Sequence, residues 1–168
     1  SGNNGSGKTT LVKLLLGELE PTAGTIMRTG FSYLYIDQEC SVIDPRLTVF
    51  EQTERFNTGN WAEHELKSIL NRYLFPYDTW DKGCACLSGG EKIRLLFCCL
   101  MIGNNAPDVF ILDEPTNNLD IQSVEIITAA IKSYRGTVLL ISHDHYFVKE
   151  IKINRSIKLF DTGSVIKI

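Results

Sequence analysis

The chain has 168 residues, of which 43% are hydrophobic, with a net charge of -3 and a mean hydropathy of -0.03. These values are ordinary for one domain with a real core, and no apolar stretch approaches the ~20 residues that span a bilayer. The negative charge gives no support to a strongly nucleic-acid-binding surface on this chain.

The chain opens on a glycine-rich segment in which Gly2, Gly7, Lys8 and Thr9 match the pattern G-x-x-x-x-G-K-[ST]. Glycines permit tight turns, so several backbone N–H groups can converge on phosphate oxygens. Lys8 is expected to reach the β- and γ-phosphates, and the Thr9 hydroxyl to bind Mg²⁺. The apolar run at residues 11–16 predicts a helix whose positive N-terminus points at the nucleotide. The residues expected to bind it here are Gly2, Asn3, Asn4, Gly5, Ser6, Gly7, Lys8, Thr9 and Thr10.

Two short strands are predicted next, at residues 24–28 and 31–36. In the second, Tyr33 and Tyr35 alternate with Leu34, which favours packing over stacking on a base. From residue 48 to about 73 the pattern turns helical. One face of that helix is formed by Leu66, Ile69, Leu70 and Tyr73.

The second half of the chain is dominated by apolar runs. Residues 95–102 are apolar nearly all round and predict a buried helix. The runs at 109–112 and 137–141 predict buried parallel strands, and between them Ile121, Val124, Ile127 and Ile131 mark a helix that ends at Gly136. The tail, 157–168, predicts two strands around a turn. Strands that alternate with helices indicate an α/β fold with a mostly parallel sheet.

Polar side chains follow three of the strands, and ligands gather at the carboxyl ends of strands in such sheets. Asp113 suits a Mg²⁺ carboxylate that faces the phosphate loop. Glu114 is expected to take the proton from a water that attacks the γ-phosphate. Gln38 would orient that water or bind the metal, and His143 would hydrogen-bond the γ-phosphate.

A second anion-binding turn precedes the buried helix. Ser88 is expected to cap this helix, and Gly89 and Gly90 expose backbone N–H groups at the positive end of its dipole. The odd count of five cysteines, two of them adjacent at Cys98 and Cys99, favours a reducing cytoplasm over a disulfide framework.

Taken in order, these motifs resemble those of ATP-binding-cassette (ABC) ATPase domains. They are the phosphate loop, a glutamine at a strand end, Leu-Ser-Gly-Gly-Glu, Ile-Leu-Asp-Glu-Pro and Ile-Ser-His-Asp. The resemblance covers nearly all of residues 1–168 and implies a P-loop NTPase fold with a helical subdomain at about 48–100. It also implies that Ser88, Gly89 and Gly90 bind ATP held by a second cassette in a head-to-tail pair. The loop with Asp120 would cross that interface beside the nucleotide.

A finer resemblance is to the ABC-F subclass, whose members carry two cassettes and no membrane domain. It rests on residues 114–120 and 142–147, on the stretch 44–49, and on Glu91 where transporters more often have Gln. No long arm separates Gln38 from the Leu-Ser-Gly-Gly turn, as in the second cassette of such proteins. The resemblance implies a cytoplasmic, Mg²⁺-dependent ATPase that hydrolyses ATP to ADP and phosphate. Any contact with the ribosome or RNA would come through regions outside this chain.

Two alternatives remain open at this stage. One is the ATP-binding subunit of an ABC membrane transporter. The other is a nucleotide-binding module without turnover, because a phosphate loop normally follows a buried strand and neither that strand nor an initiator Met is present. The chain is therefore expected to be truncated at its N-terminus within the loop.

Overall fold

The computed structural model describes residues 7–37, 40–103, 106–117 and 119–157. Its centre is a three-stranded parallel sheet in the order β1 (Tyr33–Ile36), β2 (Val109–Asp113), β3 (Thr137–Ile141). The middle strand is β2, and its residues 110–112 are buried, as their unbroken apolar run predicts. Asp113 lies opposite Ile141 in the ladder. The predicted α/β class with a parallel sheet is confirmed.

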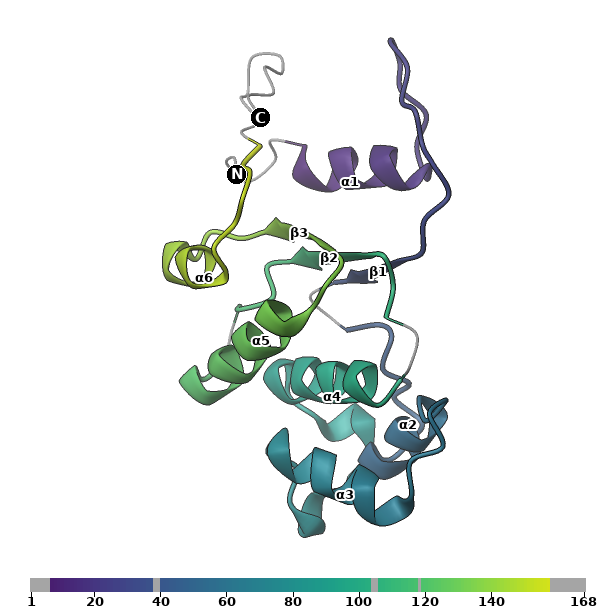
Figure 1. The fold of residues 1–168 in the computed structure, drawn as a ribbon, viewed down its shortest axis with the longest axis vertical. Coiled ribbons are helices and arrows are strands. Elements are labelled where there is room, and N and C mark those ends of the chain that lie inside the picture. The colour runs from purple at the N-terminus through teal and green to yellow at the C-terminus, as the bar shows by residue number, and fades with distance from the viewer. Residues whose placement is uncertain (1–6, 38–39, 104–105, 118, 158–168) are drawn as a thin grey trace.

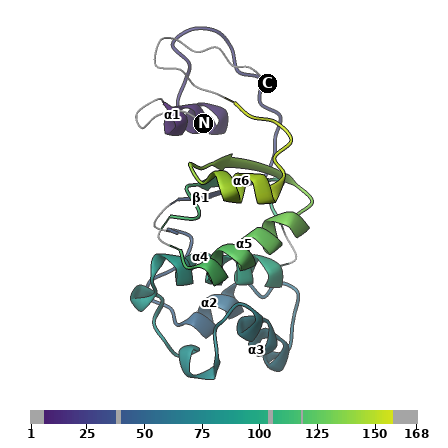
Figure 2. The ribbon, with the colours of Figure 1, turned by 90° about the vertical axis from the view of Figure 1, so that its left-hand side faces the viewer.

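Helices lie on both sides of this sheet (Figure 1). They are α1 (Lys8–Leu16), α2 (Val49–Arg55), α3 (Glu63–Arg72), α4 (Gly89–Ile102), α5 (Ile121–Ser133) and α6 (His145–Ile151). The first helix, α1, lies on one side of the sheet, and α4 and α5 lie on the other (Figure 1). The short helices α2 and α3 pack beyond α4, farthest from α1 (Figure 2). None of the helices within the described residues is long and apolar enough to cross a membrane.

The predicted buried helix is α4, which fills the space between the sheet and the α2–α3 pair. Leu95, Leu96, Cys98, Cys99 and Ile102 are fully buried. Burial raises the pKa of both thiols above the usual cysteine range, so they behave as small apolar core residues. The predicted face of α3 is also confirmed, because its three aliphatic members are buried against this core.

The sequence prediction was wrong at residues 24–28, which form no strand. Gly24 has a φ of 82°, in the left-handed region, and Met27 is 97% exposed. Arg28 instead caps the end of α1, where its Nε and Nη2 atoms donate to the Leu14 carbonyl oxygen at 3.3 and 2.8 Å. The segment therefore serves the helix rather than the sheet.

The single helical stretch expected at 48–73 is two helices. Thr48 and Glu51 form a capping box that begins α2. After α2, the Asn57 side chain donates to the Trp61 carbonyl oxygen and accepts from the Trp61 N–H, both at 2.9 Å. These bonds close a loop that separates α2 from α3. The strands predicted in the tail fall almost entirely at 158–168, outside the described residues.

Candidate nucleotide site

The first helix presents its N-terminus as the sequence predicts. Gly7 precedes α1 with a φ of 84°, a conformation that strains any residue with a Cβ. Lys8, Thr9 and Thr10 form the first turn, where backbone N–H groups have no acceptor within the helix. Such a turn is a ready anion site. The other predicted loop residues, 2–6, lie outside the described part of the chain, as does Gln38.

Glu114 follows β2 directly and turns away from the ladder. Its N–H still donates to the Ile141 carbonyl oxygen at 2.8 Å, while its φ of 50° lies in the left-handed region. A non-glycine residue with this φ is uncommon, and strained backbone of this kind clusters at functional sites. The turn directs the carboxylate, which is only 11% exposed, toward His143 at the end of β3.

Glu114, His143 and Lys8 lie close together in space, although Lys8 and His143 are 135 residues apart in sequence. The backbone N–H of His143 donates to Glu114 Oε2 at 3.2 Å, and its Nε2 lies 3.4 Å from Glu114 Oε1. Lys8 Nζ lies 3.5 Å from the same Nε2 atom. This nitrogen can accept from Lys8 or donate to Glu114, so the proton on the ring decides which contact it makes.

Glu114 Oε1 is also the acceptor with unused capacity in this site. The atom is buried and has no hydrogen bond among the described residues. A buried carboxylate oxygen without a donor is costly to maintain in a core. It suits a group that accepts a proton from water at close range.

Asp113, the last residue of β2, is held by a tyrosine from the neighbouring strand. The Tyr35 hydroxyl donates to Asp113 Oδ2 at 2.9 Å. Burial, followed by this hydrogen bond and nearby carboxylates, raises the pKa of Tyr35 to about 12, so the phenol keeps its proton. The donor set suits Mg²⁺, because carboxylate and hydroxyl oxygens such as those of Asp113 and Thr9 are the ligands that this hard cation takes.

Tyr35 is the residue whose polar role the sequence interpretation missed. Tyr35 is half-buried in β1, and its hydroxyl reaches the site. The register explains this, because Tyr35 pairs with Ile111 and therefore shares a face with Asp113 two residues farther on. Knowledge of the strand order would have been the signal.

The second predicted anion-binding turn is built as a helix cap. Ser88 Oγ accepts from the Glu91 N–H at 3.2 Å, and Glu91 Oε2 accepts from the Ser88 N–H at 2.7 Å. A Cβ placed on Gly89 would meet nothing within 4 Å, whereas one on Gly90 would lie 3.0 Å from Leu119 Cδ2. Gly89 therefore leaves room for another molecule, and Gly90 allows packing within this chain.

Asp120 likewise caps a helix, α5. Its carboxylate accepts from the Ser123 N–H at 2.7 Å and from the Ser123 hydroxyl at 3.0 Å. These bonds hold the pKa of Asp120 below its usual range. The carboxylate is therefore ionised and fixed at the start of α5, close to the Gly90–Leu119 contact.

The two predicted anion-binding turns lie apart within this chain. One begins α1 and the other begins α4, and these helices lie on opposite faces of the sheet (Figures 1 and 2). The Leu-Ser-Gly-Gly turn of this chain therefore does not lie beside its own α1 turn.

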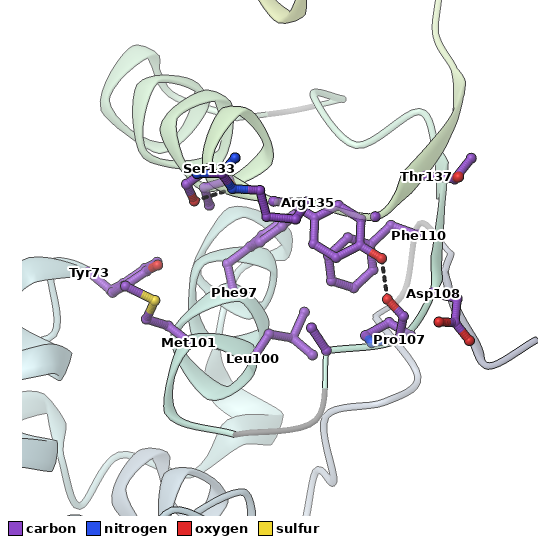
Figure 3. A pocket seen from close by; sticks show the side chains of 14 residues that line it. Tyr73, Phe97, Leu100, Met101, Pro107, Asp108, Phe110, Ser133, Arg135 and Thr137 are labelled. Carbon is purple, nitrogen blue, oxygen red and sulfur yellow. Dashed lines mark hydrogen bonds between the residues drawn. The ribbon is translucent and has the colours of Figure 1, made fainter.

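A separate cavity of about 620 Å³ lies beside α4 and α5 at the start of β2 and β3 (Figure 3). Its wall is aromatic, with the Phe110 and Tyr134 ring centroids 4.1 Å apart and the Tyr134 hydroxyl bonded to the Pro107 carbonyl oxygen. No predicted site residue in the described part of the chain lines it. Asp113, Glu114 and His143 lie instead at the opposite, carboxyl ends of these strands.

Known proteins similar to this chain include members of the F family of ABC transporters. ABC transporter F family member 5 of Arabidopsis thaliana is 41% identical over 163 residues, which cover 95% of this chain and 23% of that protein. The chain spans about a quarter of the length of curated relatives such as this one and F family member 2 of the same plant.

Solved structures share the fold. The archaeal ribosome recycling factor aABCE1, solved in complex with the ribosomal stalk protein aP1, superimposes with a TM-score of 0.67 at 28% identity. That match covers 89% of this chain and 30% of the other. The ATP-binding cassette MJ0796, solved as a dimer with ADP and Pi, gives 0.68 at 21% identity over 94% of this chain and 78% of the other. Residues 1–117 match the model of the ABC transporter family. This chain is a member of the ABC transporter family of ATP-binding cassettes.

Proposed function

We propose that this chain is the ATP-hydrolysing cassette of an ABC-F-like protein that works in the cytoplasm on the ribosome. The observation that carries the ATPase part is the meeting of Lys8, Glu114 and His143 at one edge of the sheet. Family membership and the identity to an F-family protein support the choice of nucleotide and subclass. The helices within residues 48–100 would be the helical subdomain of this cassette.

In this proposal the chain's own groups divide the work. The α1 turn and Lys8 bind the phosphates, and Asp113 and Thr9 would hold Mg²⁺, which neutralises charge on the β- and γ-phosphates. Glu114 Oε1 takes a proton from the water that attacks the γ-phosphorus, while the bond from this phosphorus to ADP breaks. The backbone N–H of His143 holds the other carboxylate oxygen, and its ring meets the γ-phosphate.

The proposal also requires a second cassette. A Leu-Ser-Gly-Gly turn from the partner cassette would close over ATP, with the open side of Gly89 against the γ-phosphate. The dimer of the MJ0796 cassette supports pairing as a property of this fold. The ribosomal part rests on relatives, since aABCE1 is named as a ribosome recycling factor.

The test uses the full-length protein with radiolabelled ATP and purified ribosomes. We expect phosphate release that requires Mg²⁺, and co-sedimentation with ribosomes that increases with ATP over ADP. ATPase activity together with co-purification of a membrane permease, and without ribosome binding, would favour a transporter subunit. ATP binding with no phosphate release in any context would identify a binding module.

A further inference from the structure

The contact between Tyr35 and Asp113 joins β1 to the carboxyl end of β2, where the site is proposed to hold Mg²⁺. The β1–β2 register places Tyr35 opposite Ile111, so its side chain extends along the sheet toward Asp113 on the same face. The hydroxyl donates to Asp113 Oδ2 at 2.9 Å. The contact depends on a phenol length, because a shorter hydroxyl on β1 would not span to the end of β2.

One donated bond has a defined effect on a carboxylate. An aspartate turns broadly about its terminal torsion, and a donor on one oxygen fixes the plane of the group. Asp113 Oδ2 is the oxygen that is held, and Oδ1 would be the oxygen offered to a ligand. Partners that orient a ligating carboxylate in this way typically change metal affinity by roughly 10–100-fold when they are removed.

We propose that Tyr35 is a positioning residue that sets the orientation of Asp113 for the Mg²⁺–nucleotide complex. This inference rests on the proposed ATPase function. It assigns to Tyr35 an effect on metal affinity and not on binding of the nucleotide base or phosphates. The competing explanation is that Tyr35 only packs. A variant that keeps the ring and removes the hydroxyl distinguishes packing from positioning.

The test variant is Tyr35→Phe, which keeps the ring and removes one oxygen. The matched control is Tyr33→Phe on the same strand and face, because the Tyr33 ring is 42% exposed and packs edge-on to Phe31. In the full-length protein, Mn²⁺ is titrated in the presence of a non-hydrolysable ATP analogue and followed by electron paramagnetic resonance. Binding of ATP in EDTA is measured alongside, as a readout of the folded phosphate site.

We expect Tyr35→Phe to raise the Mn²⁺ dissociation constant roughly 10-fold and to change the Mn²⁺ spectrum. ATP binding in EDTA and the behaviour of Tyr33→Phe should match the parent protein. Equal Mn²⁺ affinities in parent and Tyr35→Phe would overturn the positioning role and leave the ATPase proposal standing. Loss of ATP binding in EDTA would also overturn it, since the hydroxyl would then act on the fold. A parent protein that binds no nucleotide would refute the proposed function and this inference with it.

Discussion

Glu114 and His143 meet at two points, a hydrogen bond through the backbone and a longer contact through the ring. The His143 N–H donates to Oε2 at 3.2 Å, and the ring nitrogen Nε2 lies 3.4 Å from Oε1. The backbone bond does not involve the imidazole, so it holds the carboxylate whichever ring nitrogen carries the proton. The ring contact remains adjustable and brings Lys8 into the same cluster.

Replacing Glu114 with Gln tests the proposed base. The amide keeps the shape and can still accept from the His143 N–H, but it cannot take a proton. We expect ATP hydrolysis to fall ~10²–10⁴-fold in the full-length protein while ATP binding is retained. Phosphate release and equilibrium binding measure the two effects. Glu150→Gln, at an exposed glutamate paired with Lys132, is the control and should change neither. A Glu114→Gln rate close to that of the parent would assign the proton to another group.

Replacing Lys8 with Ala tests the phosphate contact. A hydrogen bond to a charged group contributes ~1.5–3 kcal/mol, which corresponds to an increase in the ATP dissociation constant of about 10–150-fold. Calorimetry measures that constant. Lys13→Ala removes the same charge from the exposed side of α1 and should leave ATP affinity within twofold. Equal losses in both variants would mean that α1 contributes only a general positive field.

Gly89→Ala separates the fold of this cassette from its pairing with another. The added methyl meets nothing within 4 Å, and alanine is the better helix former, so thermal stability should be unchanged or higher. The same methyl would intrude on a phosphate that approaches from a second cassette, so we expect hydrolysis to fall at least 10-fold. Gly30→Ala is the control, since its Cβ also meets nothing. Full activity in Gly89→Ala would argue against a closed head-to-tail pair.

Asp120 is predicted to secure the start of α5. Asp120→Ala removes a cap worth ~0.5–2 kcal/mol, so amides of the first turn should exchange hydrogen about 2–30-fold faster without nucleotide. The amides of α4 in the same sample serve as the control. Unchanged exchange in α5 would show that Ser123 does not need this carboxylate.

The same cap has a direction in pH. The bonds from Ser123 lower the pKa of Asp120 below its unfolded value, so its stabilising effect is present above ~pH 4 and is lost as pH falls through the folded pKa. Asp120→Asn caps equally well but does not ionise. Exchange in α5 should therefore depend less on pH between 5 and 3 in the Asn variant than in the parent. Parallel pH profiles would contradict the assignment.

The sequence predicted well the elements that are identified by consecutive residues of one segment. An unbroken apolar run suffices to identify β2 and α4, and Ser88, just before that run, was predicted to cap α4 and does so. The break between α2 and α3 was missed because it depends on the Asn57 side chain bonding a backbone four residues away. The spacing of apolar residues does not indicate such a side-chain hydrogen bond.

The site followed the same division. Glu114 and His143 were predicted from their places after apolar strands, and the structure brings both together. The left-handed backbone of Glu114 was not foreseen, because nothing in a glutamate favours it. The contact of the Tyr35 hydroxyl with Asp113 could not be predicted without the order of the strands in the sheet. No single segment of the sequence indicates that order.

The register in which β2 pairs with β3 sets the distance between Glu114 and His143. Each residue of a strand advances the chain by ~3.3 Å and reverses the side that its side chain faces. Inserting or deleting one residue within Val109–Asp113 or Thr137–Ile141 would therefore displace the carboxylate from the histidine without altering either. The number of residues in these two apolar strands is therefore a requirement of the site, although none of the strand residues before Asp113 needs to touch a phosphate.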